Sequence, residues 1–300
     1  MPQVRANGID IEYESFGRER DPLILFIAGF AAQLTFLPEA LCQGLAAKGF
    51  RVVRFDNRDI GKSTHFASLA APDSRALMAE VMAGKRPAVP YSLDNMADDA
   101  VGLMDALGAR RAHIAGASMG GMIAQLVAIN HPARTKSLIS IMSTTGRRDL
   151  PSGNPETLSV LFRPPNSSDR DDLIDASILV QRALSSPGFP ASEAEMRTTA
   201  ERRTDRAPFD AAGLARQSAA LIAAQPRNAL LRKLRCPALV LHGADDPVIP
   251  AAAAKDTAES IPGAELIIVS GMGHDFAMGL VPVYLKHIGD FVSKVEARAL

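Results

Sequence analysis

The chain has 300 residues, 47% of them hydrophobic, and its 33 basic side chains balance its 33 acidic ones. A chain of this size and composition can bury a large core, which excludes intrinsic disorder as its main description. Because the formal net charge is zero, no overall field draws the protein onto nucleic acid or an anionic membrane. Small molecules are therefore the expected partners.

The N-terminal residues do not indicate a secretory signal, and the spacing of the cysteines does not indicate a disulfide framework. The N-terminal residues lack the basic, apolar and small-residue segments of a secretory signal, and the apolar run at residues 23–28 is far shorter than the roughly 20 residues that cross a bilayer. We expect a cytoplasmic monomer or homodimer. Cys42 and Cys236 are far apart, so we interpret both as buried thiols and expect neither a disulfide nor a metal site.

The first elements predict a hairpin followed by a buried strand. Residues 4–6 and 9–13 show period-two alternation, and Asn7-Gly8 between them readily take the positive φ angles of a tight turn. Residues 23–28 form an apolar run without alternation, which is typical of a parallel strand covered on both faces.

Strands and helices then alternate along the chain. The predicted strands are residues 51–55, 112–115 and 137–142, and the predicted helices are residues 38–48, 93–107 and 122–130. Alternation at such short spacing predicts a parallel sheet with crossover helices.

The alternation stops near Gly146, where four prolines interrupt the chain. Helix-like segments follow without strands, at residues 171–185, 192–204 and 209–224. The strand pattern returns at residues 237–241 and 264–269, with helices at residues 251–260 and 281–295. We interpret residues 1–145 and 227–300 as the core and residues 146–226 as a helical cap.

The sequence Gly116-Ala117-Ser118-Met119-Gly120 joins a predicted strand to a predicted helix. This is the setting of the G-x-S-x-G nucleophile elbow, in which a sharp turn exposes the serine hydroxyl. The two glycines lack the Cβ atoms that would collide where strand and helix approach each other. Ser118 is therefore the candidate nucleophile.

A serine nucleophile needs a base, and the base needs a group that fixes its tautomer. Of six histidines, only His274 lies in a glycine-rich loop just after a late strand, on the edge of the sheet where the elbow is expected. The loop after residues 237–241 offers two adjacent carboxylates, Asp245 and Asp246. From the residues alone, either carboxylate could be the partner of His274.

With these motifs the whole chain resembles the α/β-hydrolase superfamily, in the branch of cap-bearing carboxylesterases and related lactonases. The resemblance implies a mostly parallel eight-stranded sheet flanked by helices, with a helical cap insertion. An H-G-x-x-D-x-x-x-P stretch precedes G-x-G-H in that family, and read onto His242–Pro250 it assigns Asp246 as the acid that orients His274. The nearest likeness is to polyketide methylesterases and small aryl and alkyl esterases.

The resemblance also implies an oxyanion hole. The elbow supplies one donor, the backbone N–H of Met119, and the loop after residues 23–28 supplies the backbone N–H of Phe30. The family usually has His-Gly before that second donor, whereas this chain has Ala28-Gly29. The segment 55–63 resembles the family's D-x-R-G-x-G-x-S loop, with Asp59 where glycine is common.

The candidate substrate-binding residues are Gly29, Leu34, Leu161, Phe162 and Phe276, between the sheet loops and the cap. Four arginines of the cap, Arg197, Arg202, Arg203 and Arg206, are interpreted as a solvated helix face. The expected activity is cleavage of carboxylic esters of small to medium, largely apolar substrates through an acyl-enzyme, with no cofactor.

Other activities of the fold stay open. A serine at the elbow argues against epoxide hydrolases and haloalkane dehalogenases, which use a carboxylate there. Prolyl iminopeptidases usually carry tryptophan after the serine, and this chain has none. Lactonases and carbon–carbon bond hydrolases share the serine, histidine and aspartate, so they are the main alternative. A non-catalytic, ligand-binding homologue is a third hypothesis.

Overall fold

An eight-stranded sheet forms the centre of the protein, as a computed structural model describes it for residues 1–165 and 167–298. The strands are β1 (Gln3–Ala6), β2 (Ile9–Phe16), β3 (Leu23–Ile27), β4 (Arg51–Phe55), β5 (Ala112–Ala117), β6 (Thr135–Ile141), β7 (Ala238–Gly243) and β8 (Glu265–Val269). They lie in the order β1-β2-β4-β3-β5-β6-β7-β8. Only β1–β2 and β2–β4 pair antiparallel. The predicted eight-stranded, mostly parallel sheet is confirmed.

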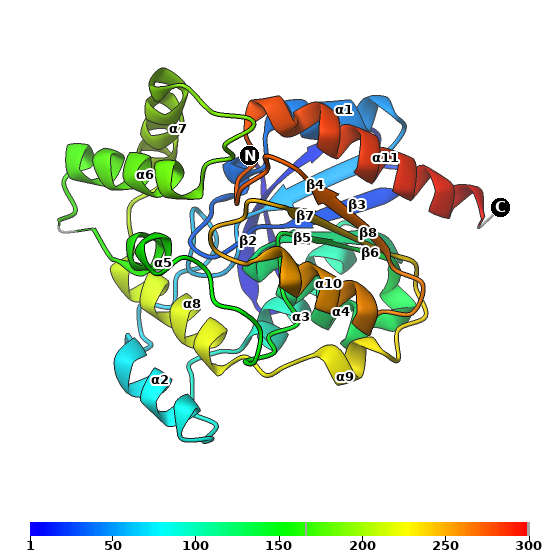
Figure 1. The fold of residues 1–300 in the computed structure, drawn as a ribbon. Coiled ribbons are helices and arrows are strands. Elements are labelled where there is room, and N and C mark those ends of the chain that lie inside the picture. The colour runs from blue at the N-terminus through cyan, green and yellow to red at the C-terminus, as the bar shows by residue number, and fades with distance from the viewer. Residues whose placement is uncertain (166, 299–300) are drawn as a thin grey trace.

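Helices cover both faces of the sheet (Figure 1). One face carries α1 (Glu39–Ala47) and α11 (Val281–Ala297), and the other carries α3 (Leu93–Ala106), α4 (Met119–Asn130) and α10 (Ala251–Ser260). Successive side chains of a strand point to opposite faces, so Ile24 belongs to one buried apolar cluster and Leu25 to the other. A strand covered on both sides must be apolar throughout, which explains the uninterrupted run in β3.

A group of helices separates β6 from β7 along the chain. It consists of α5 (Pro155–Phe162), α6 (Arg170–Leu184), α7 (Glu193–Arg206) and α8 (Ala211–Ala223), which are called the inserted helices below, and the short α9 (Asn228–Leu231) follows them. In Figure 1 the inserted helices lie together to one side of the sheet. Ile174 and Ile178 of α6 pack against Met196 and Ala200 of α7 in a small apolar cluster of their own.

Helix α2 (Ser74–Met82) was not predicted from the sequence. Its apolar stripe is short, and only Leu77 and Val81 are buried. Its first turn is capped by the Asp73 carboxylate, which accepts hydrogen bonds from the N–H groups of Arg75 and Ala76. The helix packs against α8, and no local sequence pattern predicts this contact. Across the described residues, every helix is too short or too polar to cross a membrane.

Candidate active site

Ser118 lies at the sharp turn between β5 and α4 and adopts φ 56° and ψ −122°. A non-glycine residue with this backbone conformation is strained and persists only where its surroundings hold it. Here the Ser118 N–H donates to the carbonyl of Ile141 at 3.0 Å, and the Ser143 hydroxyl donates to the Ser118 carbonyl at 2.7 Å. The end of β6 and the residues just after it therefore hold both the N–H and the carbonyl of Ser118.

Two glycines make this turn possible, as the sequence predicts. A Cβ atom on Gly120 would overlap the carbonyl oxygens of Ile27 and Ala28, and one on Gly116 would overlap the backbone of Gly120. The first turn of α4 therefore packs directly against the end of β3. This close approach brings the loop after β3 beside Ser118.

The structure brings His274 and Asp246 together. His274 Nδ1 lies 2.8 Å from Asp246 Oδ2, and both side chains are buried. The other oxygen, Asp246 Oδ1, accepts hydrogen bonds from the N–H groups of Val248 and Ile249, each at 2.8 Å. Asp245 instead accepts the Gly271 N–H at 2.8 Å. Asp246 is thus the carboxylate in contact with the histidine.

The charge of Asp246 is stabilised by its partners. Burial by itself raises the pKa of this carboxyl, but the charge of His274 and the hydrogen bonds from His242 and His274 outweigh burial and hold the pKa below its ordinary value. Asp246 therefore stays ionised at neutral pH, and in this form it keeps a proton on Nδ1 of His274 and leaves Nε2 of the neutral ring without one.

His242 also contacts Asp246, and the sequence analysis did not identify it as a site residue. Its Nε2 lies 2.7 Å from the Ile249 carbonyl and 3.3 Å from Asp246 Oδ2, so this nitrogen must carry the proton. The ring is fully buried and braces the loop that carries Asp246. The available signal was its place at the start of the H-G-x-x-D stretch.

In the described part of the chain, the structure does not join Ser118 to His274 by a hydrogen bond. Ser118, Asp246 and His274 nevertheless follow the C-terminal ends of the parallel strands β5, β7 and β8, so they share one edge of the sheet.

Both predicted oxyanion donors lie near Ser118. A Cβ atom built on Gly29 would come within 3.3 Å of Ser118 Cβ and 3.9 Å of Ser118 Oγ, so Gly29, which precedes Phe30, lies close to the hydroxyl. Met119 opens α4, where the first N–H groups of a helix have no partner within the helix. The roles of these two backbone N–H groups as oxyanion donors stay a prediction.

The candidate substrate-binding residues fall into two groups. Leu34 and Phe276 are buried and, with Ala28 and Ala117, line a cavity of only about 10 Å³, which is room for a single water rather than a substrate. Phe162 of α5 is 43% exposed, and its ring centroid lies 5.2 Å from that of Phe30. Leu161, beside it on α5, is half-buried. An inserted helix thus reaches the loop that carries the second oxyanion donor.

The inserted helices also contact the histidine loop. The N–H of His274 donates to the Leu184 carbonyl at 2.9 Å, and the N–H of Gly273 donates to the Ser186 hydroxyl at 2.8 Å. That hydroxyl in turn donates to Asp275 at 2.6 Å. The end of α6 and the segment after it therefore hold the backbone at Gly273 and His274 and the side chain of Asp275.

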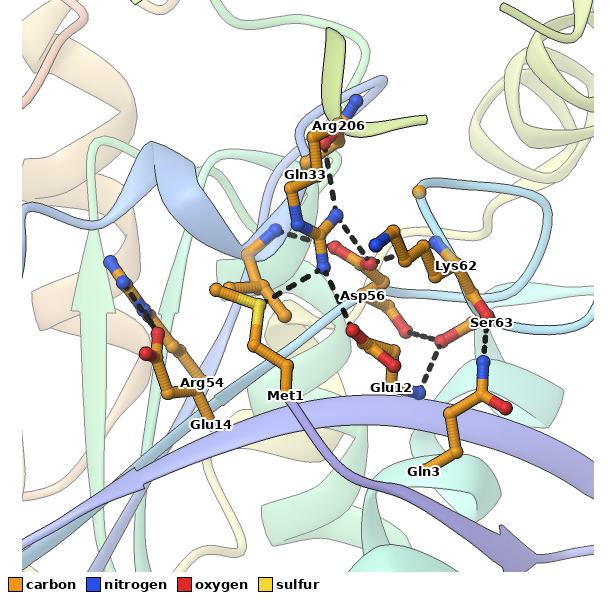
Figure 2. A network of polar contacts seen from close by, with 12 residues as sticks. Met1, Gln3, Glu12, Glu14, Gln33, Arg54, Asp56, Lys62, Ser63 and Arg206 are labelled. Atoms are coloured by element: carbon orange, nitrogen blue, oxygen red, sulfur yellow. Dashed lines mark hydrogen bonds and ion pairs between the residues drawn. The ribbon is translucent and has the colours of Figure 1, made fainter. Parts of the chain in front are cut away.

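The interpretation of the four arginines as a solvated face is wrong for Arg203, whose guanidinium donates to the Ala31 carbonyl at 2.8 Å, and for Arg206. The Arg206 side chain is 9% exposed, and it pairs with Asp56 at 2.7 Å and with Glu12 at 3.7 Å. Figure 2 shows this network between the end of α7 and the core, with Gln33 also bonded to the guanidinium. Sequence patterns miss it because residues 12, 56 and 206 meet only in the fold. Arg197 and Arg202 are exposed, as predicted.

One group of potential metal ligands occurs among the described residues, formed by Asp59, His65 and Asp210. Arg216 lies 2.7 Å from Asp59 and 3.4 Å from Asp210, so a guanidinium already neutralises both carboxylates. The arrangement suits an ion pair better than a divalent cation.

Comparison with known proteins agrees with this architecture. The profile of the alpha/beta hydrolase fold family matches residues 22–278. The chain belongs to this family. The predicted α/β-hydrolase fold is thus confirmed, and the chain is an enzyme of the α/β-hydrolase superfamily whose named relatives are chiefly hydrolases.

Two relatives and one structure illustrate the range of this α/β hydrolase's neighbours. Rhodomycin D methylesterase of Streptomyces sp. (strain C5) is 26% identical over 90% of this chain and 91% of its own. A 2-hydroxymuconate semialdehyde hydrolase of Pseudomonas sp. (strain CF600) is 30% identical over 76% of this chain and 80% of its own. A meta-cleavage product hydrolase from Pseudomonas fluorescens IP01 superposes with TM-score 0.75 and 18% identity over 98% of both chains.

Proposed function

We propose that this protein is a serine hydrolase that cleaves carboxylic esters of small to medium, largely apolar substrates. The observation that carries the proposal is the buried Asp246–His274 contact of 2.8 Å, on the sheet edge where the strained turn presents Ser118. A carboxylate that fixes a histidine tautomer beside an activated serine is the arrangement of acyl-transfer enzymes. The methylesterase relative supports an ester as the substrate.

In the proposed mechanism, His274 Nε2 removes the Ser118 proton as Oγ attacks the ester carbonyl. Asp246 stabilises the imidazolium, and the backbone N–H groups of Phe30 and Met119 bind the oxyanion. His274 then returns the proton to the departing alcohol. Water, activated by the same histidine, releases the acid and restores Ser118. The Ser118–His274 hydrogen bond would form with substrate bound, since such contacts often tighten only in the complex.

We further propose that residues 146–226 act as a cap over this site. The contact between Phe162 and Phe30 supports this role, and so do the hydrogen bonds that the N–H groups of Gly273 and His274 donate to Ser186 and Leu184. The residues proposed to bind substrate remain Gly29, Leu34, Leu161, Phe162 and Phe276. Since the cavity at Leu34 and Phe276 is water-sized, an acyl chain that entered there would have to displace neighbouring side chains.

Hydrolysis of a lactone or of a carbon–carbon bond is the second candidate. The same three side chains serve these reactions, and the relationship to a 2-hydroxymuconate semialdehyde hydrolase favours the carbon–carbon alternative. Discrimination between the candidates depends on the groups that surround the scissile bond, so it requires a substrate test.

The test is hydrolysis of p-nitrophenyl esters of graded acyl length by the wild-type protein and by Ser118→Ala. We expect the substitution to lower kcat by roughly 10⁴- to 10⁶-fold, because the nucleophile is lost. Ser293→Ala, which removes an exposed hydroxyl on α11, is the matched control and should retain activity. A folded wild-type protein that is inert on every ester, or a fully active Ser118→Ala, would overturn the proposal.

A further inference from the structure

The loop after β3, residues 28–34, carries the second proposed oxyanion donor and is called the Phe30 loop below. Ala31, directly after the donor, adopts φ 57°, a left-handed conformation that is unfavourable for a residue with a side chain. Such strain persists only where neighbouring groups hold it, and it is concentrated at functional sites. The groups that hold Ala31 are therefore informative.

Both hydrogen-bonding groups of Ala31 bind the inserted helices. Its N–H donates to Gln217 Oε1 of α8 at 3.1 Å, and its carbonyl accepts from Arg203 Nη2 of α7 at 2.8 Å. Gln217 is fully buried, and its amide nitrogen donates to the Arg58 carbonyl at 2.9 Å. Two helices that are far from Ala31 in sequence thus hold this strained residue by hydrogen bonds.

In the described ranges Arg203 has no acidic partner, in contrast to Arg206 and Arg216. Its guanidinium donates instead to the backbone carbonyl of Ala31. Gln33, two residues after Ala31, makes further hydrogen bonds between the Phe30 loop and α7. Its Nε2 donates to the Arg203 carbonyl at 3.0 Å, and its Oε1 accepts from Arg206 at 2.9 Å (Figure 2).

The core holds the two ends of the Phe30 loop. Asn57 donates to the Ala28 carbonyl at 2.9 Å, and Asp56 accepts the Leu34 N–H at 2.7 Å. The Phe30 N–H lies in the peptide between the one fixed by Asn57 and the one fixed by Gln217. The direction of the proposed donor is therefore set from the core on one side and from α8 on the other.

We propose that Gln217 and Arg203 are positioning residues of the oxyanion hole, which aim the Phe30 N–H by holding Ala31 in its left-handed conformation. The inference rests on the proposed serine hydrolase function and extends it, because it makes catalysis depend on the docking of α7 and α8. It also accounts for the departure from the family at Ala28, since the loop is oriented from the inserted helices.

The first experiment compares Gln217→Leu with the wild type in p-nitrophenyl ester hydrolysis and in the rate of Ser118 labelling by a fluorophosphonate. Leucine fills similar space but removes both hydrogen bonds. We expect kcat and the labelling rate to fall by roughly 10- to 100-fold, because a misdirected donor stabilises the transition state poorly. KM should change by less than about threefold, and the pH profile should keep its shape, since His274 and Asp246 are untouched.

Three further variants separate positioning from general loosening. Gln181→Leu removes a glutamine whose amide bonds the Met196 carbonyl at 3.0 Å within the inserted helices, and it should leave kcat unchanged. Arg203→Met should lower kcat in the same way as Gln217→Leu, and Arg203→Lys should restore most of it by donating again to Ala31. The arginine pair keeps the inference testable if Gln217→Leu fails to fold.

The outcomes distinguish this inference from the function on which it rests. A wild-type protein without ester turnover or labelling would overturn both. Wild-type activity together with folded Gln217→Leu and Arg203→Met variants of unchanged kcat would overturn the positioning role alone. Losses that Gln181→Leu reproduces, or that Arg203→Lys fails to rescue, would also overturn it, because they would report only a weakened attachment of the helices.

Discussion

Asp246 combines complete burial of its carboxylate with a full set of hydrogen-bond partners. Two backbone N–H groups bind one oxygen, while His274 and His242 lie against the other. These contacts depress the pKa of the carboxyl and keep it charged. A neutral replacement would leave His274 free to take the other tautomer, with the proton on the nitrogen that should accept it from Ser118.

For this single residue we predict that Asp246→Asn lowers kcat by roughly 10³- to 10⁴-fold while KM changes little. Steady-state hydrolysis of the best p-nitrophenyl ester measures both constants. Asp245→Asn is the matched control, because its side chain keeps an oxygen to accept the Gly271 N–H. It should lose less than tenfold in kcat, and an equal loss in the two variants would contradict the assignment.

Loop 55–63 and helix α8 are joined by an ion pair buried completely on both sides. Arg216 of α8 makes two hydrogen bonds to Asp59, at 2.7 and 2.8 Å, and both side chains have no exposed surface. Asp59 has φ 64°, a conformation that suits the glycine common in the family. The aspartate that stands in place of this glycine is stabilised by Arg216 on the inserted helix α8.

Removal of one partner should therefore be costly and removal of both should be tolerated. We predict that Arg216→Met lowers the free energy of unfolding by roughly 3–5 kcal/mol, because it leaves a buried charge unpaired. Asp59→Gly combined with Arg216→Met should recover most of this loss. Urea denaturation measures each value.

Arg170→Met provides the comparison for that double-mutant cycle. It breaks an exposed pair with Asp205 and should leave the free energy of unfolding almost unchanged, because solvent screens the two charges. A double variant as unstable as Arg216→Met alone would show that Asp59 is not the group left unsatisfied.

At the scale of the whole molecule, His113 couples folding to pH from the edge of the sheet opposite the site. It is fully buried near the start of β5, with Nδ1 2.8 Å from the Ser137 hydroxyl. Burial lowers the pKa of His113 from 6.5 to about 4, although Glu296 nearby opposes the shift. The folded protein therefore holds this ring neutral at pH values where the unfolded chain already binds a proton.

We predict that the free energy of unfolding falls as the pH drops from about 6.5 to about 4. The stabilisation is fully present above the unfolded pKa and is lost on approach to the folded one, with His113 contributing roughly 3 kcal/mol to the change. Denaturant titrations of the wild type and His113→Gln across this range measure it. The variant should show a shallower slope, and an identical slope would contradict the prediction.

Much of the fold was predictable because its signals are local. A strand covered on both faces must be apolar, as in residues 23–27, and a turn as tight as that at Ser118 requires glycines at positions 116 and 120. The candidate site was predictable for the same reason, since each of its side chains follows the end of a strand. Helix α2 was missed because its stability comes from packing against α8 rather than from a pronounced stripe of its own.

The sequence by itself determined the alternating architecture, the elbow and the candidate serine, histidine and pair of carboxylates, because propensity and hydrophobic periodicity act over a few residues. The family resemblance assigned Asp246 rather than Asp245 to His274, and the tertiary structure shows that contact. Only the tertiary structure decided that Arg216 neutralises Asp59 and that Gln217 holds Ala31. These three contacts join residues 28, 157 and 186 positions apart. Their geometry depends on the path of the whole chain, which no short stretch of sequence encodes.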